Sequence, residues 1–111
     1  MAKVDKAYLK SLLETPSVTG TEVQVANLLR ERLADVADEI ETNVMGSVHA
    51  RLKGSGAAPS VLIAAHMDEV GLMVTHISDQ GFLSVSAVGC VDAAVLPGMR
   101  VDVHTQTQTL R

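Results

Sequence analysis

Residues 61–71 read Val-Leu-Ile-Ala-Ala-His-Met-Asp-Glu-Val-Gly, and this stretch decides how the rest of the chain is interpreted. The apolar run that opens it is typical of a strand buried on both faces of a sheet. His66 and Asp68 follow at the carboxyl end of that strand, where the loops of α/β proteins open a crevice for ligands. Side chains two residues apart in extended chain share a face, so we expect His66 and Asp68 to point the same way.

A His-x-Asp pair suits a metal-bound imidazole. A nearby carboxylate fixes the tautomer and orientation of the ring and makes its ligating nitrogen more basic. However, these residue types at this spacing also occur by chance. A buried histidine that is hydrogen-bonded to the aspartate, with no metal, explains the spacing too, and the spacing alone leaves both interpretations open.

Two helices are predicted before this stretch, from apolar residues at helical spacing. The first ends at Thr15, because the residue before Pro16 is pushed out of the helical region. The second follows a segment, residues 19–22, with the pattern of a capping box: the Thr19 hydroxyl accepts from the amide three residues on, and Glu22 reaches back. The two apolar stripes comprise Tyr8, Leu9, Leu12 and Leu13, and then Val25, Leu28, Leu29, Leu33 and Val36.

From residue 39 the apolar period changes to two, which predicts strands separated by turns. The expected strands are residues 40–44, 48–52, 61–65, 70–77, 82–88 and 100–104. The alternation of the last seven residues also resembles a strand. Helices followed by strands, with one strand buried on both faces, favour the α/β class.

Composition excludes some classes of function. The 111 residues are 47% hydrophobic, carry a formal charge of −4 and show no cluster of Lys or Arg, which disfavours nucleic-acid binding. No apolar run approaches the ~20 residues that span a bilayer, and the polar N-terminus lacks a signal-peptide core. A single cysteine, Cys90, cannot form an internal disulfide. We therefore expect a cytoplasmic protein without a nucleic-acid or membrane partner.

Several motifs together resemble one protein family. Residues 66–71, with the apolar residues on either side, are similar to the glutamyl/tetrahedral aminopeptidases, a family of co-catalytic zinc metallopeptidases whose members are also called deblocking aminopeptidases and endoglucanase-like proteins. Residues 15–22 resemble that family's Pro-Gly-Val-Ser-Gly-x-Glu loop. Residues 88–92 and 95–101 resemble its Val-Gly-Gly-x-Asp and Leu-Pro-Gly-x-x-Val stretches. Motifs that occur in the family's order are far more specific than one His-x-Asp.

This resemblance implies an α/β catalytic domain into which a small β domain, used for subunit pairing, is inserted. Residues 1–69 would form the N-terminal part of the catalytic domain, with two helices and sheet strands. Residues 70–111 would begin the inserted β domain and would be truncated within it.

The resemblance also implies a function and a site. The family removes N-terminal residues from peptides with two divalent metal ions, zinc or cobalt. By that resemblance His66 is a metal ligand, Asp68 is the catalytic-site carboxylate that positions it, and Glu69 is a structural residue rather than the general base. The family's remaining ligands and its base follow the inserted domain, so we expect this N-terminal portion to be inactive alone.

Two classes of function stay open. The first is an aminopeptidase fragment that another polypeptide completes. The second is a non-catalytic interaction module that pairs with itself, as a homo-oligomer, or with a full-length relative through an unfinished β edge, because such an edge is a template for association.

The other candidate residues have simpler interpretations. His49 and His104 are expected to be exposed strand residues, and His76 to pack on the face with Leu72 and Val74. Cys90 is expected to be a small buried thiol. Cys90 stands where the family usually has a second glycine, the residue type that adopts left-handed backbone conformations most readily.

Overall fold

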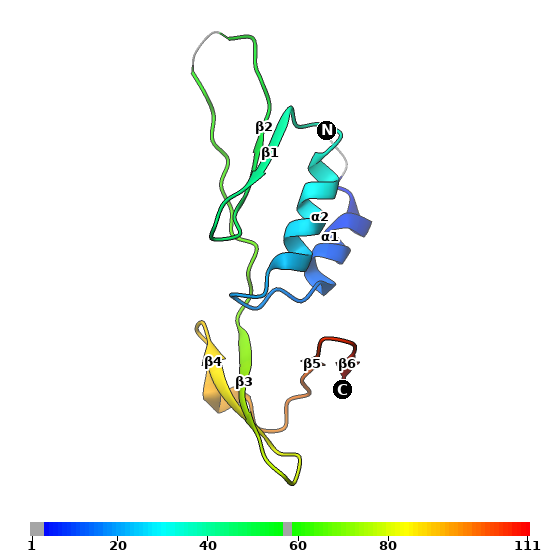
Figure 1. Cartoon of the computed structure of the whole chain (residues 1–111), viewed down its shortest axis with the longest axis vertical. Coiled ribbons are helices and arrows are strands. Elements are labelled where there is room, and N and C mark those ends of the chain that lie inside the picture. The colour runs from blue at the N-terminus through cyan, green and yellow to red at the C-terminus, as the bar shows by residue number, and fades with distance from the viewer. Residues whose placement is uncertain (1–3, 57–58) are drawn as a thin grey trace. The chain divides into compact units, whose positions relative to one another are not determined.

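The computed structural model describes residues 4–56 and 59–111 (Figure 1). The chain divides into two units, Met1–Asp68 and Glu69–Arg111, which are described separately below. That the first belongs to a catalytic domain and the second to an inserted β domain stays a prediction.

Helix α1 (Lys6–Glu14) opens the first unit and ends where the sequence predicts. The Asp5 carboxylate caps it by accepting from the amide of Tyr8 at 3.1 Å. Thr15 is extended, with ψ 121°, as a residue before proline must be. Arg32, from the end of α2, ties the two helices together: its guanidinium lies 5.0 Å from the Tyr8 ring centre and 3.2 Å from Asp5.

Helix α2 (Val23–Leu33) carries the small core of the first unit. Val25 is 3% and Ala26 4% exposed, and these are the buried hydrophobic residues in the part of the chain that the structure describes. Burying a valine side chain contributes roughly 1.5–3 kcal/mol. The predicted stripe is only partly confirmed, because Val36 lies beyond the helix and is exposed.

The predicted capping box at the start of α2 is wrong in its main contact. Glu22 is the N-cap residue, and its own side chain makes no capping hydrogen bond to the helix. The Glu22 carboxylate does reach back, but it accepts from the amide of Gly20, at 2.8 Å. Gly20 has φ +94°, a left-handed conformation that turns the chain and favours glycine. The Thr19 hydroxyl is thus available for another partner.

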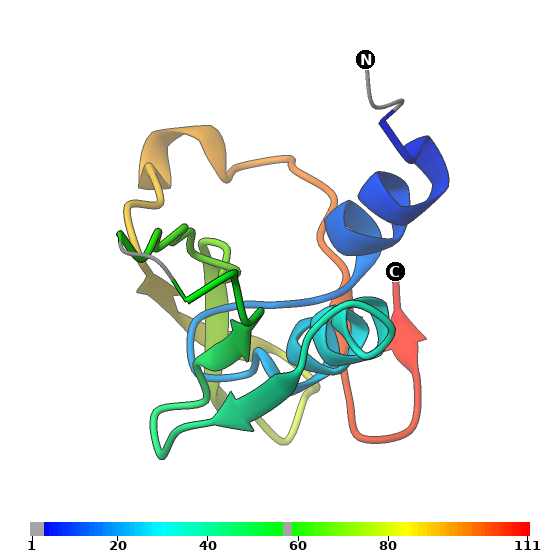
Figure 2. The ribbon, with the colours of Figure 1, turned by 90° about the horizontal axis from the view of Figure 1, so that it is seen from above.

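Strands β1 (Glu39–Thr42) and β2 (Val48–Arg51) form the predicted hairpin of the first unit. They pair antiparallel, with Thr42 opposite Val48. The Asn43 side chain organises the turn by accepting from the amides of Met45 and Ser47. β2 contacts α2, and Arg30 of that helix donates to the Thr42 hydroxyl at 2.9 Å, so the hairpin lies beside the helix (Figure 2).

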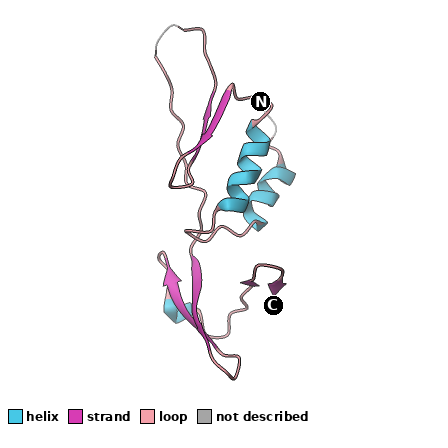
Figure 3. Cartoon of the chain, in the orientation of Figure 1, coloured by secondary structure: helices cyan, strands magenta, loops and turns pink. Residues whose placement is uncertain are grey.

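Residues 61–65 do not form the buried strand that the sequence predicts. The segment is extended loop (Figure 3), and Val61, Leu62 and Ile63 are 82%, 90% and 90% exposed. A strand buried on both faces needs neighbouring strands and covering layers. In the described residues no strand pairs with this segment.

Strands β3 (Gly71–Ile77) and β4 (Leu83–Val88) form the main hairpin of the second unit, as predicted. They pair antiparallel from Gly71 opposite Val88 to Ile77 opposite Leu83, with an irregularity between Val74 and His76. A bulge changes the alternation of side chains. His76 is exposed, as are Met73 and Val74 on the same strand, so the prediction that it packs with Leu72 and Val74 is wrong.

A short 3-10 turn and a small hairpin complete the second unit. The turn η1 (Ala93–Val95), which is not among the predicted elements, is capped by the Asp92 carboxylate. Strands β5 (Val103–His104) and β6 (Thr109–Leu110) pair antiparallel. None of the helices described is long and apolar enough to cross a bilayer.

Candidate functional site

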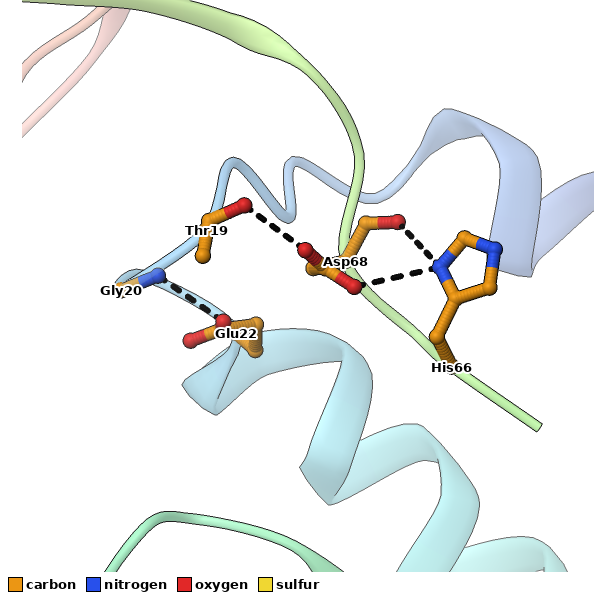
Figure 4. Close-up of polar contacts among 5 residues, drawn as sticks. All are labelled: Thr19, Gly20, Glu22, His66 and Asp68. Carbon is orange, nitrogen blue, oxygen red and sulfur yellow. Dashed lines mark hydrogen bonds and ion pairs between the residues drawn. The ribbon is translucent and has the colours of Figure 1, made fainter. Parts of the chain in front are cut away.

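His66 and Asp68 lie at the end of the extended segment that follows residue 59, within the first unit (Figure 4). The imidazole Nδ1 of His66 is 3.1 Å from Oδ1 of Asp68 and 3.0 Å from the Asp68 backbone oxygen. The two side chains meet, as the two-residue spacing in extended chain suggests. Their roles in a metal site stay a prediction.

These contacts assign the proton on the His66 ring. A backbone carbonyl oxygen can only accept a hydrogen bond, and an ionised carboxylate likewise only accepts. Both oxygens face Nδ1, so Nδ1 carries the proton and donates. The neutral ring then has its lone pair on Nε2, and the side chain is 86% exposed. An exposed imidazole with a held Nδ1–H and an available Nε2 has the form of a metal ligand.

Thr19 is the third member of this cluster. Its hydroxyl donates to Oδ2 of Asp68 at 2.7 Å, across a sequence separation of 49 residues. Asp68 therefore uses one carboxylate oxygen for Thr19 and the other for His66 (Figure 4). The sequence predicts a capping role for Thr19 instead, because the local pattern fits a capping box and no periodicity reports a contact between such distant segments.

The two hydrogen bonds also shift the ionisation of Asp68. The Thr19 hydroxyl, and after it His66, hold the pKa of the Asp68 carboxyl below its usual value, because both stabilise the charged form. Asp68 is thus an acceptor at neutral pH, which is the state that the Nδ1–H of His66 requires.

The other candidate residues lie outside the cluster of His66, Asp68 and Thr19, and one of them, Cys90, differs from its prediction. His49 and His104 are exposed, as predicted, and His104 contacts the Thr109 hydroxyl at 3.0 Å. Cys90 is exposed, so its prediction as a buried thiol is wrong. The left-handed turn there is made by Gly89, at φ +77°, and Cys90 has no positive φ. Glu69 is exposed.

The donor set fits one coordination position of a metal site. Across residues 4–56 and 59–111 no group of three or more His, Cys, Asp or Glu side chains comes together as a metal site. His66 offers Nε2, and Asp68 is engaged by the imidazole and by Thr19. The cluster is therefore suited to hold the His66 imidazole in a defined orientation, as one of the ligands that a metal ion needs.

A family model described as M42 glutamyl aminopeptidase matches residues 46–111, more than half of the chain. The lysyl aminopeptidase of Pyrococcus furiosus is 40% identical over 104 residues, which cover 93% of this chain and 30% of that enzyme. The chain thus spans less than a third of the length of this relative.

Solved structures of similar proteins resemble this chain as well. The TET aminopeptidase of a Thaumarchaeota archaeon from marine sediment has a TM-score of 0.87 at 34% identity, over 95% of this chain and 29% of that one. A Thermotoga maritima protein named as an endoglucanase has a TM-score of 0.82 at 34% identity, over 92% of this chain and 32% of its own. The α/β fold expected from the sequence is confirmed by this likeness.

Proposed function

The chain belongs to the M42 glutamyl aminopeptidase family, and we propose that it supplies some of the residues of a divalent-metal site that removes N-terminal residues from peptides. The observation that carries the proposal is the His66–Asp68 pair, whose contacts direct the imidazole proton to Nδ1. The named aminopeptidases among the similar proteins support a peptide as the substrate.

In this proposal each residue has a distinct task. His66 presents Nε2 as a ligand to zinc or cobalt, and Asp68 holds the ring against rotation and keeps its proton on Nδ1. When bound, divalent metal ions polarise the scissile carbonyl and activate a water molecule. The exposed His66 side chain leaves room for further ligands around Nε2.

The site needs more ligands than this cluster provides. A catalytic zinc ion takes three or more protein ligands, and His66 is one. We infer that the others come from residues outside the cluster, on the same polypeptide or on a second one, and that the 111 residues alone have no peptidase activity. A cytoplasmic location is part of the same proposal.

Calorimetric zinc titration and the hydrolysis of a leucine anilide test this function. We expect weak or undetectable zinc binding and no hydrolysis from the purified 111 residues. Mixing with a polypeptide that carries the remaining segments of a relative should produce hydrolysis that His66→Asn abolishes. His49→Asn is the matched control, because His49 is an exposed histidine away from the cluster, and it should retain activity. Tight stoichiometric zinc, or hydrolysis by the isolated chain, contradicts the inferred incompleteness.

An interaction module is the second candidate function, and the exposed apolar segment favours it. Val61, Leu62 and Ile63 are more than four-fifths exposed, and each two-stranded sheet presents unpaired edges. Light scattering combined with metal analysis separates the candidates. A defined metal-free dimer supports the module, whereas dependence on an added second polypeptide supports the aminopeptidase fragment.

A further inference from the structure

The Asp68 carboxylate is held at both of its oxygens, from two distant parts of the chain. Oδ1 accepts from Nδ1–H of His66, and Oδ2 accepts from the Thr19 hydroxyl at 2.7 Å (Figure 4). A carboxylate held at one oxygen alone can rotate about the bond to its Cβ, because that torsion is broad. The second hydrogen bond restricts this rotation and fixes the oxygen that faces the imidazole.

Thr19 is well placed to provide that restraint, because its turn is itself hydrogen-bonded. The Gly20 amide donates to Oε1 of Glu22 at 2.8 Å. The amide and the hydroxyl of Thr21 both donate to the Val18 carbonyl, at 2.8 and 2.6 Å. Gly20, at φ +94°, lets the chain reverse between Thr19 and the start of α2.

The Thr19 hydroxyl has no capping duty that would explain its orientation. The helix begins at Val23 with Glu22 as its N-cap, and the Thr19 hydroxyl donates to Asp68 instead. The turn could therefore have been closed without a hydroxyl at position 19. What the hydroxyl adds is the contact with Asp68, which itself contacts the candidate metal ligand.

We propose that Thr19 is a positioning residue, which acts through Asp68 to hold the His66 imidazole with its proton on Nδ1 and its lone pair on Nε2. The catalytic consequence of this inference rests on the proposed function. Partners behind a metal-ligating histidine typically change metal affinity about 10–100-fold. The hydrogen-bond chain itself belongs to the 111 residues and is testable without metal.

The test is the ratio of the two neutral His66 tautomers, measured by long-range proton–nitrogen NMR above pH 8. His66→Asn assigns the signal among the four histidines. Thr19→Val keeps the shape of the side chain and removes the hydroxyl. It should lower the ratio of Nδ1–H to Nε2–H tautomer by roughly two- to tenfold, the range expected for one lost hydrogen bond. Thr19→Ser should restore the original ratio.

Thr15→Val is the matched control, because Thr15 precedes this turn and its hydroxyl donates to the Ser11 carbonyl, not to Asp68. It should leave the tautomer ratio unchanged. An unchanged ratio in Thr19→Val, in a background where Asp68→Ala changes it, overturns the proposal. Thr19→Ala is a second variant without the hydroxyl. Loss of the α2 amide signals in both hydroxyl-free variants would make Thr19 a structural residue and would overturn the proposal as well.

The two proposals fail separately. If the tautomer depends on Thr19 but the completed protein needs no His66 for hydrolysis, the metal-ligand role fails and the positioning role stands. If hydrolysis needs His66 but the tautomer is independent of Thr19, only the positioning role fails.

Discussion

Residues 61–65 and strand β3 are both apolar segments that the sequence predicts as strands, yet only β3 forms one. β3 pairs with β4 across a turn at residues 78–82. Residues 61–65 have no pairing strand among the described residues and leave their apolar side chains exposed. The difference lies in where the partner comes from.

In a hairpin, the pairing strand follows within a few residues of the chain, whereas a central strand pairs with strands that are distant in sequence. Closing a short loop costs less entropy than closing a long one. The β3–β4 turn is also prepared locally: Gly81, at φ +85°, donates to the Ser78 carbonyl, and the Ser78 hydroxyl accepts from the Phe82 amide. Strand formation here thus follows from local pairing and not from apolar character alone.

The largest effect is expected from Gly89→Ala, which should destabilise the β3–β4 hairpin. Gly89 follows β4 at φ +77°, and a Cβ there would lie 2.7 Å from Cγ1 of Val70 and 3.4 Å from its Cβ. Left-handed strain alone costs roughly 1–3 kcal/mol, and this steric overlap adds to it. Amide hydrogen exchange should show a loss of protection in β3 and β4 of about 10-fold or more.

Gly98→Ala is the matched control for this substitution. Gly98 has φ +80° in the same unit, but a Cβ there would meet nothing within 4 Å. It should therefore cost only the backbone strain. Equal effects of the two substitutions would show that the close approach to Val70 contributes nothing to the hairpin.

A smaller effect is expected at the short β5–β6 pair when the pH is lowered. Arg111 donates to Asp102 at 2.7 Å and lowers the pKa of that carboxyl, chiefly through the hydrogen bond. The contribution is present above the usual aspartate pKa of about 4, and it is lost as the pH falls through the lower folded value. Because the pair is exposed, solvent screens it and the effect is modest. Backbone NMR shifts of Thr109 and Leu110 should follow this transition.

Asp102→Asn should remove that pH dependence. The substitution keeps the size of the side chain and cannot titrate. If the shifts of β6 change between pH 4 and pH 2 in the same way in both proteins, another group controls the strand pair.

The smallest effect on stability is expected in the unpaired segment, from replacing Val61, Leu62 and Ile63 with threonine one at a time. In a buried strand each replacement would be costly, but these side chains are 82–90% exposed. The free energy of unfolding should change by less than about 0.5 kcal/mol per site, as is usual at surface positions. Urea denaturation monitored on α2 measures it. A loss of several kcal/mol would mean that the segment is buried in solution.

Local signals were sufficient for most of the fold. Pro16 ended α1 at Glu14, the period of two gave both larger hairpins, and glycines marked their turns. The sequence failed where the outcome depends on partners or on an irregularity. Residues 61–65 have no pairing strand in the part of the chain that the structure describes, and an irregularity before His76 shifts the register of the β3–β4 pair.

In the candidate site, too, the sequence predicts the local contact but not the long-range one. His66 and Asp68 meet because they are two residues apart, which the sequence reports directly. Thr19 meets Asp68 across 49 residues. Its local context, with a glutamate three residues on, favours a capping box, so the competing long-range hydrogen bond is visible only in three dimensions.

The exposure of Cys90 has a consequence for measurements of self-association. One accessible thiol per chain cannot close a ring within a molecule, but it can join two molecules through an intermolecular disulfide. Oxidation in storage would then produce covalent dimers of the mass expected from strand pairing. A sample kept in reductant, or a Cys90→Ser variant, retains only the non-covalent species, and its mass in solution reports whether the β edges associate.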